Sequence, residues 1–197
     1  MENDDNKAKR IINGPALGYT DIFSKREMWQ EIAAELKGEF KITMTSGNVL
    51  EIHNISIPYK KWNIGISVSD SKPMKFHILF QSYQNFKLTI SWEDFIDKIQ
   101  KKFRKPEIEL GWEEFDKHYL IKSNKPDWVK EIMTFEIQKT LLKYNVCSLS
   151  IQPNESNNSA ELVSVIQRNS SNKEMVLELL DTFKLLIDNL LKSRIIK

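Results

Sequence analysis

The chain has 197 residues, of which 29 are basic and 27 acidic, giving a formal net charge of +2. This length predicts one domain with a core large enough to be stable without disulfides or bound metal. The near balance of charge excludes the strong basic excess typical of nucleic-acid-binding proteins, so we do not expect a nucleic-acid partner. The single cysteine, Cys147, cannot form an internal disulfide or a paired-cysteine metal site.

The start of the chain differs in character from the rest. Residues 1–22 are mostly polar and are interrupted by glycine and proline, which predicts a flexible arm before a single α+β domain at 23–197. That domain divides into two sub-halves, 24–90 and 91–194, each combining helix and sheet. The polar N-terminus does not resemble a signal peptide, and no stretch approaches the roughly 18 apolar residues of a membrane-spanning helix. We therefore expect a cytoplasmic protein without a transmembrane segment.

The first sub-half predicts one helix and a meander of strands. Ser24 and Glu27 form a capping box, and Gly38 ends the helix that follows. Alternating apolar residues then predict four strands joined by short turns, which is typical of antiparallel pairing. The alternation slips by one residue at His53–Asn54, which predicts a β-bulge there and places His53, like His77, on the solvent side.

The second sub-half predicts more helices and a hairpin. The expected elements are a helix at 91–103, a strand at 115–122, helices beginning near Asn124 and at Thr134, a hairpin of 147–151 with 161–168, and a last helix capped by Asn172. Cys147 alternates in phase with Leu149 and Ile151, so it should be buried as a small apolar residue. The order α-ββββ-α-β-α-α-ββ-α favours an α+β fold with mainly antiparallel sheet packed by helices.

The sequence lacks the motifs of common enzymes and cofactor-binding proteins. It has no glycine-rich phosphate loop, no GxSxG, no HExxH and no CxxC. The three histidines, His53, His77 and His118, are far apart and have no metal-ligand spacing. We therefore expect no cofactor and no metal site.

One run carries the residue types of acid–base chemistry. On a strand at 115–122, Glu114, Asp116 and His118 would share one face, because side chains alternate with period two. A carboxylate beside an imidazole is the starting material of general acid–base catalysis. The alternative is a solvated strand face opposite Phe115 and Tyr119, which needs no function.

Two other features suggest contact surfaces. A basic run at 98–105 lies at the end of a predicted helix that begins with Glu93 and Asp94, so favourable interaction with the helix dipole explains it without a partner. Trp112 and Trp128 follow turn or cap residues, where an exposed tryptophan can anchor a partner, and edge-of-core packing is the alternative for both. Trp112 and Trp62, which begins a predicted strand, are the candidate contact residues.

The segment Phe115-Asp116 through Ile121-Lys122-Ser123-Asn124 resembles a motif of uncharacterised bacterial α+β proteins, FDxxFxIKSN, with Tyr119 in place of the second Phe. The stretch 57–64, IPYKKWNI, is similar to such proteins as well. The resemblance implies a bacterial α+β domain, soluble or membrane-peripheral. It carries no assigned activity, so it assigns no catalytic residue.

These observations lead to one functional prediction and two alternatives. The absence of catalytic motifs and the near-neutral charge favour a non-enzymatic binding or interaction module, with a contact surface near Trp62 and the segment 111–118. The first alternative is a hydrolase that uses Glu114, Asp116 and His118. The second is self-association through the C-terminal helix or a sheet edge.

Overall fold

The computed structural model describes residues 25–44, 50–69, 72–82, 84–92, 108–154, 157–166 and 172–197. The described helices are α2 (Arg26–Glu35), α4 (Glu113–His118), α5 (Pro126–Ile132), α6 (Phe135–Lys143) and α7 (Lys173–Lys192). The described strands are β1 (Glu39–Met44), β2 (Glu51–Tyr59), β3 (Trp62–Ser69), β4 (Met74–Gln81), β5 (Leu88–Trp92), β6 (Tyr119–Ser123), β7 (Val146–Asn154) and β8 (Ser159–Ile166).

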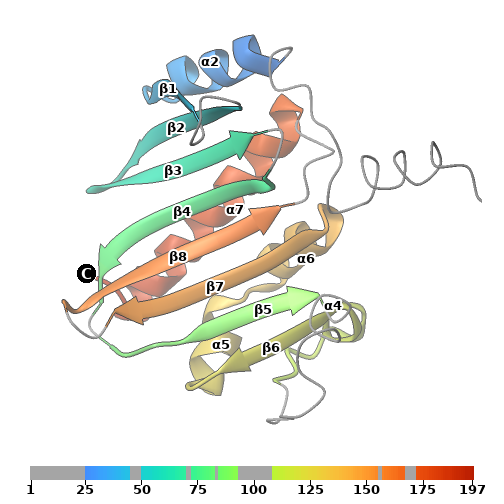
Figure 1. Cartoon of the computed structure of the whole chain (residues 1–197). Coiled ribbons are helices and arrows are strands. Elements are labelled where there is room, and N and C mark those ends of the chain that lie inside the picture. Colours follow the sequence, from blue (N-terminus) through green and yellow to red (C-terminus); the bar gives the residue numbers. More distant parts are fainter. Residues whose placement is uncertain are drawn as a thin grey trace, which may run out of the picture.

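The eight strands form one antiparallel sheet in the order β1-β2-β3-β4-β8-β7-β5-β6 (Figure 1). The meander β1 to β4 and the hairpin β7–β8 pair as neighbours along the chain, which confirms the α+β fold with antiparallel sheet predicted above. The sheet is completed by long-range pairing, because β8 joins β4 and β5 lies between β7 and β6.

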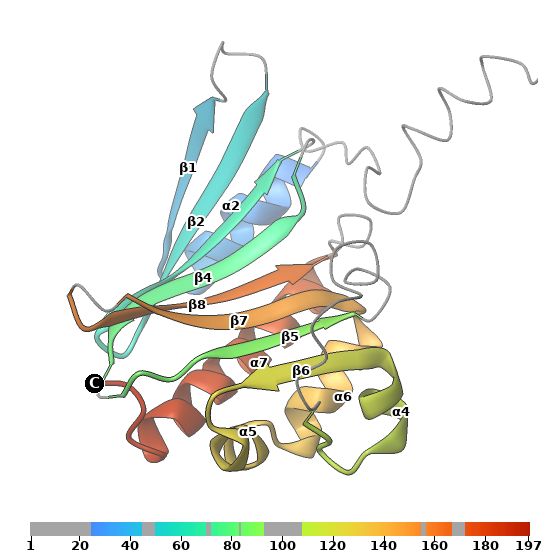
Figure 2. The ribbon, with the colours of Figure 1, turned by 60° about the horizontal axis from the view of Figure 1, so that its bottom comes forward.

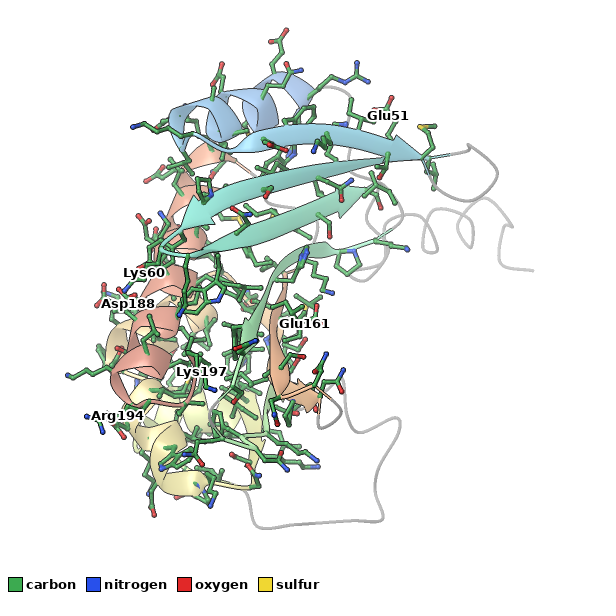
Figure 3. All side chains as sticks on the ribbon, turned by 90° about the vertical axis from the view of Figure 1, so that its left-hand side faces the viewer. Glu51, Lys60, Glu161, Asp188, Arg194 and Lys197 are labelled. Carbon is green, nitrogen blue, oxygen red and sulfur yellow. The ribbon has the colours of Figure 1, made fainter. Side chains whose placement is uncertain are left out.

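Helices α2, α5, α6 and α7 lie on one face of the sheet (Figure 2). The side chains that point to this face form the apolar core, with Ile64 and Ile66 of β3, Phe76 of β4 and Leu162 of β8 all nearly inaccessible. The opposite face carries alternate residues such as Ser67, His77, Glu161 and Val163, which are only partly buried. We call this second surface the open sheet face, because no described helix lies against it. Figure 3 shows Glu161 on this side, away from α7.

The long helix α7 holds the sheet together across its width. Asn172 caps it, because its side-chain oxygen accepts a hydrogen bond from the Met175 backbone N–H, as predicted from the sequence. Near its other end Asp188 accepts a hydrogen bond from the Tyr59 hydroxyl and pairs with Lys60 at 2.7 Å (Figure 3). Burial and the Asp188 carboxylate together raise the pKa of Tyr59 to about 12. None of the described helices is long and apolar enough to cross a membrane.

Two predictions about strand phase are wrong. Strand β2 pairs with both neighbours without any register shift, so there is no bulge at Asn54, and His53 lies on the core face with no exposed surface. Its Nε2 lies 3.1 Å from the Glu51 carboxylate and its ring meets Phe40 edge-on, whereas its Nδ1 has no hydrogen-bond partner among the described residues. The register shift is instead in β7 between Val146 and Ser148. It leaves Cys147 only partly buried, and Val146 takes the core position.

Several expectations fall on residues outside the described ranges. These are the arm 1–22, the Ser24 hydroxyl of the first capping box, and the basic run at 98–105. The helix predicted at 91–103 also lies there, except that Ser91 and Trp92 end strand β5.

Candidate binding surface

The segment that suggested acid–base chemistry begins as a helix and not as a strand. Residues Glu113–His118 form α4, and β6 starts only at Tyr119, so the prediction of a strand from 115 is wrong in its first half. Helical geometry places Glu114 and His118 one turn apart and Asp116 on another side. The acidic first turn favours a helix here, and the spacing of four between Phe115 and Tyr119 fits a helix as well as a strand.

Asp116 has a structural task within this helix. One carboxylate oxygen accepts a hydrogen bond from the Leu110 N–H at 2.9 Å, and the other accepts from the Gly111 N–H at 2.8 Å. Gly111 has a φ of 93°, a conformation that glycine adopts without steric cost. Asp116 therefore fixes the turn that leads into Trp112.

Two other side chains of α4, Lys117 and His118, have partners outside the set Glu114, Asp116 and His118. Lys117 pairs with Glu113 at 2.6 Å, one helical turn away. The His118 ring meets Trp92 and Tyr119 edge-on, at centroid distances of 5.6 and 5.3 Å. The structure thus does not reproduce the shared strand face on which the hydrolase hypothesis was built, and that hypothesis stays a prediction.

The structure does bring four aromatic rings into a continuous column at this end of the sheet. Tyr119 and Phe115 lie 4.6 Å apart between ring centroids, Phe115 stacks on Trp112 at 6.3 Å, and Trp112 meets Phe135 at 4.8 Å. The inner end is fixed, because the Tyr119 hydroxyl donates a hydrogen bond shared between the Leu141 and Val146 carbonyl oxygens, each at 2.9 Å. Burial raises the pKa of this tyrosine well above its usual range.

The column runs from the core to the surface. Tyr119 is 4% exposed and Phe115 is fully buried, Trp112 is partly buried, and Phe135 is 60% exposed. We call the outer two rings, Trp112 and Phe135, the aromatic patch. Exposed Glu114 and Glu136 stand beside it along the chain, whereas Glu113 already has Lys117 as its partner. The result is an apolar surface beside two exposed acids for which the described residues supply no ion pair.

Of the two tryptophans predicted as a contact surface, only Trp112 belongs to this patch. Trp62 starts β3, with the Lys61 ammonium 5.1 Å from its ring centroid. Strands β3 and β6 are third and eighth in the sheet, so five strand spacings, about 24 Å, separate their positions. Sequence reasoning missed Phe135. The available signal was that it lies off the apolar stripe of Ile137 and Leu141 in α6, so a large aromatic ring had no place in the core.

A polar groove lies between α6 and α7, and Glu136, which follows Phe135 in the chain, is among its lining residues. It has a volume of about 620 Å³ and is lined by Glu136, Lys139, Thr140, Lys143, Glu178, Asp181, Thr182 and Leu185. Glu178 in its wall pairs with Lys143 at 2.7 Å and accepts a hydrogen bond from Tyr144, so these partners hold the pKa of its carboxyl below the usual range. Among the described residues, no group of three or more histidine, cysteine or acidic side chains could hold a metal ion.

Comparison with known proteins shows a similar fold. The crystal structure of the mycobacterial trehalose monomycolate transport factor A, TtfA, superposes with a TM-score of 0.53 at 9% sequence identity, covering 83% of this chain and 93% of that chain. No protein-family model matches the chain, and a search of curated proteins finds no match. The chain therefore shares an α+β fold with this transport factor.

Proposed function

We propose that the protein is a non-catalytic interaction module whose aromatic patch anchors a partner protein. The observation that carries the proposal is Phe135, a large apolar side chain that is 60% exposed and yet packed against Trp112. Rings that are already held in place lose little side-chain entropy on binding, which is why aromatic residues dominate the energetic centres of interfaces.

The charges around the patch define the kind of partner. Glu114 and Glu136 are exposed beside the rings, so a segment with lysine or arginine next to an apolar anchor would gain both ion pairs and cation–π contact. The polar groove beginning at Glu136 gives room for the rest of such a segment.

Two further points support a binding role. The protein with the similar fold is named as a transport factor and not as an enzyme. At 9% identity this likeness concerns the fold, so we do not carry over trehalose monomycolate as a ligand. Two of the three residues proposed for a hydrolase also have structural partners, since Asp116 holds the turn before Trp112 and the His118 ring packs against Trp92 and Tyr119. The cytoplasmic location expected from the sequence is part of the same proposal.

The test is selection of displayed random peptides on the purified protein. We expect selected peptides to combine basic residues with an aromatic or large aliphatic residue, and their affinity to fall as salt rises. The variant Phe135→Ser should weaken them at least tenfold, about 1.4 kcal/mol. Leu79→Ser is the matched control, because Leu79 is 65% exposed on the open sheet face of β4.

Equal binding by wild type and Phe135→Ser would contradict the proposal. The rival hydrolase hypothesis has a separate test on a panel of ester, phosphate and peptide substrates. Turnover that is lost in both Glu114→Gln and His118→Ala, with unchanged circular dichroism, would establish the enzyme and refute a purely binding role.

A further inference from the structure

Strand β1 forms one edge of the sheet. It pairs with β2 along all six residues, and in the described part of the chain no strand pairs with its other side (Figure 2). Every second residue of such an edge directs its N–H and C=O outward, which makes the edge a template for another strand.

On the face covered by α2, the described residues of this edge lack the features that usually prevent pairing with another strand. Phe40, Ile42 and Met44 share this face because they alternate along the strand and oppose the core-facing residues of β2. Ile42 is 38% exposed and Met44 is 45% exposed. The charges of β1, Glu39 and Lys41, lie on the other face and pair with each other at 2.8 Å. The strand has no proline and its pairing shows no bulge, so no described residue on the helix side protects it.

We propose that β1 pairs antiparallel with β1 of a second copy of this chain, around a two-fold axis at Ile42. A two-fold axis perpendicular to the sheet keeps each side chain on its own face. Opposed residues must therefore both have even numbers or both have odd numbers. One residue then lies opposite its own copy, and the two-fold axis passes between these two residues. With near-complete overlap of the six residues, that residue is 41 or 42.

Charge and apolar contact select the axis at Ile42. An axis at Lys41 would place two lysines directly opposite each other, which is unfavourable. An axis at Ile42 places Ile42 opposite Ile42 and Phe40 opposite Met44 on the helix side, and Lys41 opposite Thr43 on the other face. This register covers the exposed apolar residues of both copies at once.

Helix α2 leaves room for the second copy. It packs across β1 and β2, so the two copies of α2 would lie about 10 Å apart, the ordinary spacing of packed helices. Its acidic pair, Glu31 and Glu35, points to Lys173 of α7, with the closest contact at 2.9 Å. By helical periodicity the side toward the β1 edge carries exposed Glu27, Gln30 and Ala34, so a single acid and no row of acids faces its copy.

The test is disulfide cross-linking in a Cys147→Ser background, which removes the native thiol. Ile42→Cys places two thiols directly opposite each other in the proposed register. The matched control is Thr43→Cys on the same strand, because Thr43 would oppose Lys41 and lie two positions from its own copy. We expect Ile42→Cys to form covalent dimers at least tenfold faster under mild oxidation. Equal rates for the two variants, or no dimer from either, would refute the register.

Sedimentation of the cysteine-free chain gives an independent readout. We expect association that grows with protein concentration, that Ile42→Lys abolishes and that Leu79→Lys leaves unchanged. A chain that stays monomeric at every accessible concentration, or a dimer that survives Ile42→Lys, would overturn the proposal. Phe135→Ser should leave the dimer unchanged, so this inference and the proposed function can fail separately.

Discussion

The two ends of the sheet are finished in different ways. At the β6 end, the Ile108 N–H from outside the β5–β6 pair donates to the Ile121 carbonyl of β6, and Asn124 ties the end of β6 to the backbone of Asn85 and Lys87 before β5. At the β1 end, β1 pairs with β2, the next strand in the chain, and α2 covers one face. The outer side of β1 is unpaired in the described part of the chain. Long-range contacts therefore order the end with the aromatic patch, whereas mainly local contacts order the end available to a second copy.

The largest expected effect is at the β6 end. Phe115→Ala should lower the free energy of unfolding by about 3–5 kcal/mol, because a fully buried ring in the centre of the aromatic column leaves a cavity. Chemical denaturation measures this. Phe135→Ala at the exposed end of the same column should change stability by less than about 0.5 kcal/mol. Similar losses for both variants would show that the exposed ring also supports the fold.

The next effect compares a glycine at each end. Gly38→Ala, between α2 and β1, should cost about 1–3 kcal/mol, because the new Cβ would lie 2.5 Å from the Ser56 carbonyl oxygen. Gly111→Ala meets no atom within 4 Å but keeps a φ of 93°, so it should cost about 1–2 kcal/mol through backbone strain alone. Thermal unfolding of both variants checks these values, and a neutral Gly38→Ala would mean that the α2–β1 connection yields easily.

A smaller effect is expected from the turn before Trp112. Asp116→Ala should cost about 1–2 kcal/mol, because the Leu110 and Gly111 N–H groups lose their acceptors. Because this turn leads into Trp112, the fluorescence emission of Trp112 should change in the same variant. Glu114→Ala on the same helix is the control and should leave stability and emission as they are; equal effects of the two variants would refute a special role for Asp116.

The smallest effect concerns acid pH at the β1 end. Arg26 donates to both carboxylate oxygens of Glu51 at 2.9 Å, and this holds the pKa of the carboxyl below its usual range. A lowered folded-state pKa contributes stability that is present above the unfolded-state value, about 4.3, and is lost as pH falls through the folded-state value. Glu51→Gln should therefore flatten the loss of stability on acidification, measured by denaturation across a pH series. If the stability of Glu51→Gln falls on acidification as steeply as that of the wild type, Glu51 contributes nothing to the acid sensitivity.

Local patterns predicted much of the fold because they report single elements well. The alternation in β3 and β4, the apolar stripe of α7 and the Asn172 cap each depend on residues a few positions apart. Predictions were wrong where one pattern fits two structures. Phe115 and Tyr119 are four apart, which suits a strand or a helix, and His53 is polar although it occupies a core position.

The α+β class, the antiparallel pairing of neighbouring strands and the core stripes of the helices follow from the sequence, because apolar period and turn residues act over a few positions. The pairing of β8 with β4, the place of β5 between β7 and β6, and the identity of each edge strand follow from tertiary packing. Tertiary packing also brings Trp112, which precedes α4, against Phe135 of α6. Such contacts between distant segments depend on the packing of the whole core and leave no periodic signal in the chain.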